Sequence, residues 1–379
     1  MTSYRFSYGP RLIAGAGSSR DLAELLPPGP CLFVTDVQIR DLGLADTALA
    51  SLQAAGIAPA VFDAVESDPS RDTLMKAVQM GKGCASVVGF GGGSPMDVAK
   101  LAAYLVGSGD DLDALWGVGK AVGVRLPLVL IPTTAGTGSE ATPVTIITVG
   151  KHEKRGVSSI ALIADWAILD PALTTGLPRA VTAATAIDAM VHAIEAYTSA
   201  RLKNPMSDLL ARQALGLLAE NLGSVLDEPG DLERRGRMLL GAHLAGVAFA
   251  NAPVAGVHAL AYPLGGHFHV PHGLANAMML APVLGHNMPV SMPHYAELGR
   301  LLDPSLEALG AQAQAQAFVE RMSALCRSTG LPSRLAELGI GAGDVALLAG
   351  EAMKQERLLI NNPRPITEAD ARRLYEAVL

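Results

Sequence analysis

Cysteine, clustered basic residues and long apolar runs are all scarce in this 379-residue chain. Its three cysteines, Cys31, Cys84 and Cys326, lie far apart with no CxxC spacing. That pattern is typical of reduced thiols in a cytosolic protein and argues against a disulfide framework. The 29 lysines and arginines are outnumbered by 36 acidic residues and form no basic stripe. A net charge of −7 therefore argues against a nucleic-acid partner.

No apolar run approaches the roughly 18–20 residues that a bilayer-spanning helix needs. The first residues, MTSYRFSYGPRLIAG, lack the basic patch and apolar core of a secretory signal. We therefore expect a cytoplasmic protein with no membrane partner. Half of the residues are hydrophobic, which is enough for a large buried interior. At this length two domains are expected rather than one.

The first half of the chain alternates short apolar runs with helix-like stretches. Strands are predicted near 31–36, 58–65, 85–92 and 127–134, with helices near 44–56, 71–83 and 94–107. Continuous apolar strands that alternate with helices predict a parallel sheet covered on both faces. Two more strands are predicted within 142–159, around a polar turn.

The pattern changes near Val181. The segments 182–200, 205–226, 232–250 and 305–330 are long, rich in alanine and leucine, and helically periodic. We predict an α/β nucleotide-binding domain over residues 1–181 and an all-helical domain over residues 182–379.

A glycine-rich turn in VVGFGGGSPMDVAK (87–100) joins a predicted strand to a predicted helix. Its backbone N–H groups, at Gly91, Gly92, Gly93 and Ser94, are placed to approach phosphate oxygens at a helix N-terminus. The spacing fits neither the dinucleotide fingerprint nor a P-loop, so a plain strand–helix turn is the alternative. A second small-residue loop after a strand, IPTTAGTGSEAT (131–142), favours phosphate binding, because such loops gather at the carboxyl ends of parallel strands.

A transition-metal site is predicted from two histidine-containing segments. Asp188 and His192 lie four residues apart in a predicted helix, so both project from one largely apolar face. A buried carboxylate there needs a cation or hydrogen-bond donors. Four of the nine histidines then follow within 258–272, namely His258, His267, His269 and His272. Two of these four are expected to complete the site, and the spacing alone does not choose which two.

Several motifs, in order and over nearly the whole chain, resemble those of the iron-containing, or group III, alcohol dehydrogenases. They are GFGGGSPMDVAK (89–100), IPTTAGTGSEATPVTIIT (131–148), IDAMVHAIEAYTS (187–199), GVAFANAPVAGVHALAYPLGG (246–266), PHGLANAMMLAPV (271–283) and NNPRPIT (361–367). The resemblance implies an N-terminal nicotinamide-binding domain and a C-terminal helical domain with a divalent metal in the cleft between them. This is the two-domain architecture of dehydroquinate synthase.

The resemblance also implies particular site residues. The metal ligands would be Asp188, His192, His258 and His272, whereas His267 and His269 match no ligand position. The dinucleotide would contact Gly92, Gly93 and Ser94 at its pyrophosphate, with Asp97 nearby, Thr133, Thr134 and Thr137 along its remainder, Lys154 near the nicotinamide and Asp68 near the adenine.

Two positions affect cofactor choice and proton transfer. Asp36 ends the first strand, where a carboxylate can accept hydrogen bonds from the adenosine ribose and repel a 2′-phosphate. NAD rather than NADP is therefore expected, although Asp36 could also simply cap a turn. The family commonly has a histidine four residues after the third ligand, where this chain has Tyr262. A phenol ionises only well above neutral pH, so either Tyr262 relays the proton with help from the metal, or water does.

The implied activity is metal-dependent hydride transfer between NAD(H) and a small alcohol, aldehyde or ketone. Four protein ligands leave no open position on a tetrahedron, which favours Fe²⁺, with Zn²⁺ as the alternative on grounds of affinity. A maleylacetate-type or other oxo-acid reductase is the nearest alternative function, and a dehydroquinate synthase-like lyase a more distant one. A homodimer would be ordinary for the family.

Overall fold

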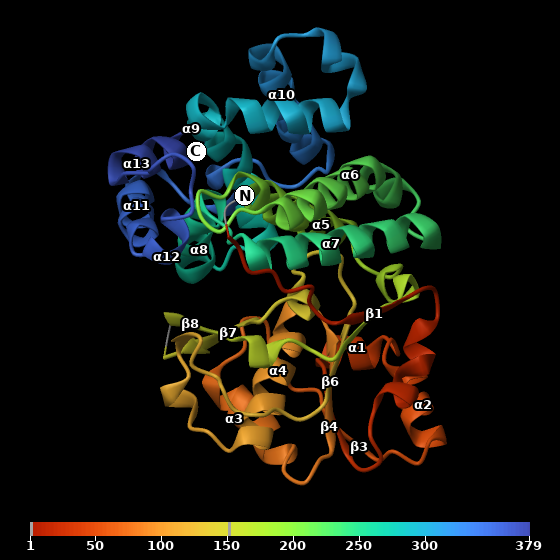
Figure 1. The fold of residues 1–379 in the computed structure, drawn as a ribbon. Coiled ribbons are helices and arrows are strands. Elements are labelled where there is room, and N and C mark those ends of the chain that lie inside the picture. Colours follow the sequence, from red (N-terminus) through yellow and green to blue (C-terminus); the bar gives the residue numbers. More distant parts are fainter. Residues whose placement is uncertain (1–2, 151–152) are drawn as a thin grey trace. The chain divides into compact units, whose positions relative to one another are not determined.

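The computed structural model describes residues 3–150 and 153–379. The chain divides into two compact units. One consists of Tyr8–Gly176 and Gly230–Leu239, and the other of Met1–Ser7, Leu177–Pro229 and Leu240–Leu379. We call them the sheet unit and the helical unit and describe each by itself (Figure 1).

The sheet unit is built on six parallel strands, as the alternating pattern predicts. In spatial order they are β1 (Arg11–Ala14), β9 (Trp166–Leu169), β6 (Leu128–Pro132), β4 (Ser86–Gly91), β2 (Cys31–Val34) and β3 (Pro59–Phe62). From β2 the chain first adds β3 on one side and then returns to add β4 on the other. The strand order therefore reverses between β2 and β4, and in such sheets ligands bind outside the carboxyl ends of the strands at that point.

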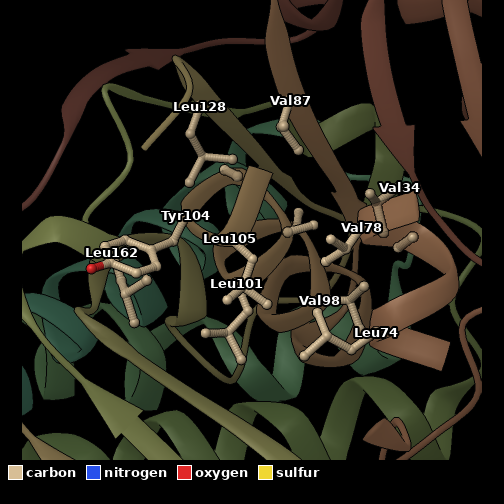
Figure 2. Packing of buried hydrophobic residues seen from close by; sticks show 14 of the residues in the cluster. Val34, Leu74, Val78, Val87, Val98, Leu101, Tyr104, Leu105, Leu128 and Leu162 are labelled. Carbon is tan, nitrogen blue, oxygen red and sulfur yellow. The ribbon is translucent and has the colours of Figure 1, made fainter. Parts of the chain in front are cut away.

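Side chains of the central strands alternate between two cores, because successive residues of a strand point to opposite faces. Leu32, Val87 and Leu128 belong to one core, which Figure 2 shows with Leu101 and Tyr104 of the helix that covers this face. Their immediate neighbours Phe33, Val88 and Val129 belong to the other core. Both faces of the sheet are therefore buried, which explains the continuous apolar runs in the sequence.

Helices cover each face of this sheet. The helices α3 (Arg71–Met80) and α4 (Gly93–Ser108) contribute to the first core, and η1 (Ser18–Leu25), α1 (Val37–Asp41) and α2 (Asp46–Ala54) to the second. Side-chain caps set two of the helix starts. Ser70 accepts a hydrogen bond from the backbone N–H of Thr73 at the start of α3, and Asp36 accepts one from Ile39 at the start of α1.

The two strands predicted within 142–159 do not extend the main sheet. They are β7 (Val144–Val149) and β8 (Glu153–Ser158), which pair antiparallel in a separate sheet with β5 (Gly117–Val118). Part of the polar turn between β7 and β8, residues 151 and 152, lies outside the described residues.

The described residues from 177 onward form helices and connecting segments without a strand. The helices are α5 (Arg179–Thr198), α6 (Pro205–Asp227), α7 (Leu232–Asn251), α8 (Gly256–Phe268), α9 (His272–Leu302), α10 (Ala311–Ser328), α11 (Val345–Met353), α12 (Glu356–Leu359) and α13 (Glu368–Glu376). The division into units falls inside α7. In the helical unit α5 packs against α6 and α9, and α9 packs against α8 and α10 (Figure 1).

The single helix predicted over 305–330 is wrong in its first part. A short 3₁₀ helix, Pro304–Ala308, comes first, and α10 begins only at Ala311. Gly310, with extended backbone, stands at the N-cap of α10 and separates the two.

Among the described residues, no single helix has both the length and the apolar composition needed to cross a membrane. The pair α7 and α8 passes that test only together, across a bend of 105°.

Candidate metal centre and dinucleotide site

Helix α5 carries one carboxylate and one imidazole side chain on one buried face. Asp188 and His192 are one turn apart, with only 2% and 5% of their surfaces exposed. Their nearest distance, from Asp188 Oδ1 to His192 Nε2, is 3.6 Å. The spacing seen in the sequence thus places both groups in the same interior.

Two histidines from later helices reach the same carboxylate oxygen. His258 Nε2 of α8 lies 3.7 Å from Asp188 Oδ1, and His272 Nε2, at the first residue of α9, lies 3.6 Å from it. The donor atoms of Asp188, His192, His258 and His272 all lie within 4.8 Å of one another. Donors that bind one ion at about 2.0–2.2 Å in a tetrahedron lie roughly 3.3–3.6 Å apart. The three distances from Asp188 Oδ1 are close to that range, and the chemistry of the donor set, one carboxylate and three imidazoles, suits a transition-metal ion. His272 has 41% of its side chain exposed, which leaves one side of the centre open.

Burial and charge oppose each other at Asp188. Burial alone would raise the pKa of this carboxyl group, but the three histidines and the amide of Asn276 hold it below its ordinary value. The carboxylate is therefore the favoured form, and a carboxylate is the form that binds a metal.

Glu195 fixes the orientation of His258. It lies on α5, is 4% exposed, and its Oε2 is 2.7 Å from His258 Nδ1. A carboxylate only accepts, so Nδ1 carries the hydrogen and Nε2 presents its lone pair to the centre. Glu195 also accepts hydrogen bonds from the backbone N–H groups of Ala255 (2.9 Å) and Val257 (2.6 Å) at the start of α8. The Glu195 side chain therefore fixes both the orientation of the His258 ring and the position of the start of α8, the helix that carries it.

Replacing Glu195 with glutamine is expected to weaken metal binding about 10- to 100-fold, as loss of a ligand's supporting carboxylate commonly does. Glutamine's amide nitrogen cannot accept the hydrogen bonds that one carboxylate oxygen accepts now. The dissociation constant for Zn²⁺, measured by chelator competition, checks this.

The matched control is Glu220→Gln, on the exposed side of α6, which should leave the dissociation constant unchanged. An unaltered dissociation constant in Glu195→Gln would mean that the backbone alone positions His258.

Helix α9 is held very close to α5 at the metal centre. A Cβ at Gly273, next to His272, would lie 2.4 Å from the carbonyl oxygen of Ala184, so only glycine fits. Asn276, one turn later, lies among the ligands, and its Nδ2 is 2.6 Å from Asp188 Oδ1. Neither Asn276 nor Glu195 is predicted as a site residue from the sequence, because each shows its role only when the helices meet.

The NNPRPIT motif supports the start of α8. Asn362 Oδ1 accepts hydrogen bonds from Gly256 N (3.3 Å) and Asn287 Nδ2 (3.0 Å), and Asn361 Nδ2 donates to Val254 O (2.9 Å). A Cβ at Gly256 would lie 2.6 Å from Asn362 Oδ1. These contacts fix the backbone just before His258.

Of the remaining candidate residues, Tyr262 lies next to a metal ligand, whereas His267 and His269 lie outside the ligand cluster. The ring of Tyr262, one turn after His258, has its centroid 5.8 Å from that of His272. His267 Nε2 lies 3.8 Å from Glu351 Oε2, and His269 caps the end of α8 with left-handed backbone. The described four-ligand cluster contains neither His267 nor His269.

In the sheet unit, Asp36 and the glycine turn meet where the strand order reverses. Asp36 follows β2, and Gly91 ends the neighbouring strand β4. A Cβ at Gly91 would lie 3.6 Å from Asp36 Oδ2 and 2.9 Å from the ring of Pro95, at a φ of +145° that favours glycine. Asp36 Oδ1 accepts the cap hydrogen bond from Ile39 (2.9 Å), so capping occupies one of its two oxygens.

The turn between β4 and α4 has the properties of an anion site. Gly92 is the N-cap of the 16-residue α4, makes no side-chain cap, and no acid occupies the helix's first turn. The backbone N–H groups at the start of α4 are therefore placed to donate hydrogen bonds to a phosphate. The predicted threonines border this turn: Thr133 N donates to Gly91 O (2.9 Å), Thr134 Oγ1 is 4.0 Å from a Cβ at Gly92, and Thr137 Cγ2 is 3.1 Å from a Cβ at Gly93. Ser94 is the second residue of α4.

Asp97 anchors the second loop. Its Oδ1 accepts from Ser139 Oγ (2.6 Å) and its Oδ2 from Ile146 N (2.8 Å). The fully buried Lys100, one turn along α4, lies 3.1 Å from Asp97 Oδ1 and donates to the carbonyl oxygens of Ser139 (2.8 Å) and Val144. The pair therefore ties residues 139–146 to α4.

Two predicted cofactor contacts lie together. Lys154 Nζ is 2.6 Å from Asp68 Oδ1, and Thr148 Oγ1 donates to Asp68 O (3.0 Å). These contacts hold the two side chains beside each other in the sheet unit. That Lys154 serves the nicotinamide and Asp68 the adenine stays a prediction.

Comparisons with protein families match both halves of the chain. Residues 9–171 match the family described as iron-containing alcohol dehydrogenase, and residues 182–379 match the C-terminal region of the Fe-containing alcohol dehydrogenase family. A long-chain-alcohol dehydrogenase of Geobacillus thermodenitrificans is 39% identical over 351 residues, which cover 91% of this chain and 88% of the relative.

Solved structures give the same result. The crystal structure of a 1,3-propanediol oxidoreductase is 31% identical, with a TM-score of 0.95 and full coverage of both chains. Sulfoacetaldehyde reductase from Bifidobacterium kashiwanohense, solved in complex with NAD⁺, is 26% identical, with a TM-score of 0.87 over 100% of this chain and 99% of that one.

Proposed function

This chain belongs to the iron-containing alcohol dehydrogenase family and is an oxidoreductase, and from that premise we propose that it interconverts small alcohols and aldehydes with NAD(H) and Fe²⁺. We further propose that residues 1–181 bind the dinucleotide and that residues 182–379 hold the metal. The observation that carries the proposal is the convergence of Asp188, His192, His258 and His272 on one point.

Those four side chains would hold the ion, with Glu195 behind His258. An ion bound there supplies a Lewis acid, which lowers the pKa of an alcohol hydroxyl and, in the reverse direction, polarises a carbonyl. The exposed side of His272 provides the access for the substrate oxygen. Tyr262, whose ring lies beside that of His272, is the proposed relay for the hydroxyl proton.

The dinucleotide would bind at the reversal point of the sheet. Gly92, Gly93 and Ser94 would donate backbone hydrogen bonds to the pyrophosphate, and Thr133, Thr134 and Thr137 border the same turn. Asp97 contributes by holding the second loop. Lys154 is proposed to lie near the nicotinamide and Asp68 near the adenine, and the two side chains form an ion pair with each other. The nicotinamide, when bound, supplies the hydride acceptor or donor.

Fe²⁺ is proposed over Zn²⁺ because of the number of protein donors. Four ligands are already present before a substrate oxygen arrives, whereas catalytic zinc usually keeps three. The test is anaerobic purification with elemental analysis, followed by assays of metal-free, Fe²⁺-loaded and Zn²⁺-loaded protein with NADH and a panel of aldehydes. Turnover that needs no metal would contradict the proposal.

Asp36 is proposed to select NAD over NADP. Replacing it with serine keeps an oxygen that caps α1 and removes the charge that would repel a 2′-phosphate. We expect kcat/KM for NADPH relative to NADH to rise about tenfold or more, which corresponds to roughly 1.4 kcal/mol.

The control for that substitution is Asp41→Ser, an exposed acid at the other end of α1. It should leave the cofactor ratio unchanged. Equal use of both cofactors by the unaltered protein would contradict the role of Asp36.

Reduction of an oxo acid is a second candidate, and one contact favours it. The guanidinium carbon of Arg357 lies 6.0 Å from the centroid of the Tyr262 ring, which in turn neighbours the metal ligand His272. A cation there could pair with a substrate's anionic group. The similar sulfoacetaldehyde reductase is named for an aldehyde that carries an anionic group. Two aldehydes of equal length, one ending in a methyl and one in a carboxylate, distinguish the candidates by their kcat/KM values.

A further inference from the structure

Asn276 lies among the proposed metal ligands, although the resemblance to the family does not place it in the ligand set. Its side chain projects from α9 one turn after His272 and is 0% exposed. Its Nδ2 is 2.6 Å from Asp188 Oδ1, 3.2 Å from His272 Nε2 and 3.3 Å from His258 Nε2. One amide nitrogen therefore contacts donor atoms from three of the four ligands.

These contacts use the lone pairs that a metal ion needs. His258 donates its Nδ1 hydrogen to Glu195, so its Nε2 faces Asn276 as an acceptor. The carboxylate oxygen of Asp188 is likewise an acceptor only. An amide NH₂ group has hydrogens but no ligand lone pair to offer a cation, so it competes with the ion for the same electrons.

The other end of the amide is an unused acceptor. Among the described residues, no group donates a hydrogen bond to Asn276 Oδ1, which is fully buried. Burying an acceptor without a hydrogen-bond donor is destabilising. Rotation about the last side-chain torsion, which is broad for asparagine, exchanges the positions of Oδ1 and Nδ2. One turn earlier on α9, Gly273 packs directly against Ala184, so the helix that carries Asn276 is held close to α5.

We infer that Asn276 is a fifth protein donor of the metal centre and binds the ion through its carboxamide oxygen. The inference rests on the proposed metal centre. The residue set then becomes two pairs four residues apart, Asp188 with His192 on α5 and His272 with Asn276 on α9, completed by His258. A second oxygen donor raises the coordination number above four, which suits Fe²⁺ better than tetrahedral Zn²⁺.

Co²⁺ is the probe, because its visible absorption reports coordination number: four-coordinate Co²⁺ absorbs far more strongly than five- or six-coordinate Co²⁺. Full-length protein is titrated with Co²⁺ and its dissociation constant measured by chelator competition. The variants are Asn276→Leu, which keeps the approximate volume without a donor, and Asn276→Asp, which keeps an oxygen. The control is Asn221→Leu, a buried asparagine on α6 whose Nδ2 donates to Leu217 O of its own helix.

We expect Asn276→Leu to weaken Co²⁺ binding at least tenfold and to intensify the visible bands. Asn276→Asp should keep the weak bands of the unaltered protein and bind Co²⁺ at least as tightly, and Asn221→Leu should change neither quantity. Unchanged bands in Asn276→Leu overturn the inference whatever the affinity does, since Asn276 would then act only through Asp188. If Asn276→Leu fails to fold, strong four-coordinate bands in the unaltered protein or in Asn276→Asp overturn it equally.

Failure of the metal centre itself has a different signature. The unaltered protein would bind no Co²⁺, or Asp188→Asn would bind it as tightly as the unaltered protein does. In either case the proposed function and the inference fail together, whereas normal Co²⁺ binding that Asn276 does not affect overturns the inference alone.

Discussion

Asp188→Asn is expected to reduce kcat/KM for aldehyde reduction roughly 10³-fold or more and to leave the purified protein without its metal. Asp188 Oδ1 lies 3.6–3.7 Å from all three histidine donors, so it is the common neighbour of the ligand set. Asparagine keeps the shape and an acceptor for Asn276 but removes the only charge in the set. A Lewis acid contributes several kcal/mol to transition-state stabilisation, and each 1.4 kcal/mol is tenfold in rate.

The control for this substitution is His267→Ala, which removes a histidine from the same stretch of sequence but from outside the cluster. It should keep both its metal and its activity. Elemental analysis and steady-state rates are measured on both variants, with NADH binding by fluorescence as a separate readout. Asp188→Asn should still bind NADH, and a variant that keeps its activity after losing its metal would exclude metal-dependent chemistry.

The parts of this site that the sequence predicts are those set by local geometry. Asp188 and His192 are four residues apart in a long helix, so their shared face follows from helix pitch alone. Gly91 to Ser94 span the junction of β4 and α4, so their position at a sheet edge also follows. The choice of His258 and His272 among four histidines needed the family resemblance, because it depends on where α8 and α9 lie against α5.

Residues that position a metal ligand through hydrogen bonds could not be identified from the sequence in the same way. Glu195 looks like any acidic residue on a helix until Ala255, Val257 and His258 are brought to it across about sixty residues of chain. Similarly, Lys154 and Asp68 are 86 positions apart, and only the fold reveals that they form an ion pair.

The fold class was predictable from the sequence, whereas several helices, among them α8 and α9 of the metal centre, were not. The parallel sheet follows from apolar strands that alternate with helices, and its two cores follow from period-two alternation. The helices α8 and α9 contain Pro263, Pro282, Pro289 and Pro293, which argue locally against a helix. Tertiary packing of α9 against α5, α8 and α10 outweighs that local cost. The sequence also could not show that β7 and β8 leave the main sheet, because pairing partners are non-local.

Lys100→Met is expected to destabilise the sheet unit by about 3–5 kcal/mol, the usual cost of removing one partner of a buried ion pair. Burial lowers the pKa of Lys100, and the charge of Asp97 offsets part of that shift. Methionine fills a similar volume, but it leaves Asp97 without its cation and the carbonyl oxygens of Ser139 and Val144 without their donor. The thermal midpoint should fall by roughly 10 °C.

The control for stability is Lys76→Met, which removes an exposed lysine from α3 and should leave the midpoint unchanged. Because Lys100 and Asp97 act as one unit, Asp97→Asn combined with Lys100→Met should cost less than the sum of the two single changes. NADH affinity should fall as well, since the loop that carries Thr133, Thr134 and Thr137 is tied to α4 through this pair. Additive losses would show instead that Lys100 acts through the two carbonyl oxygens rather than through Asp97.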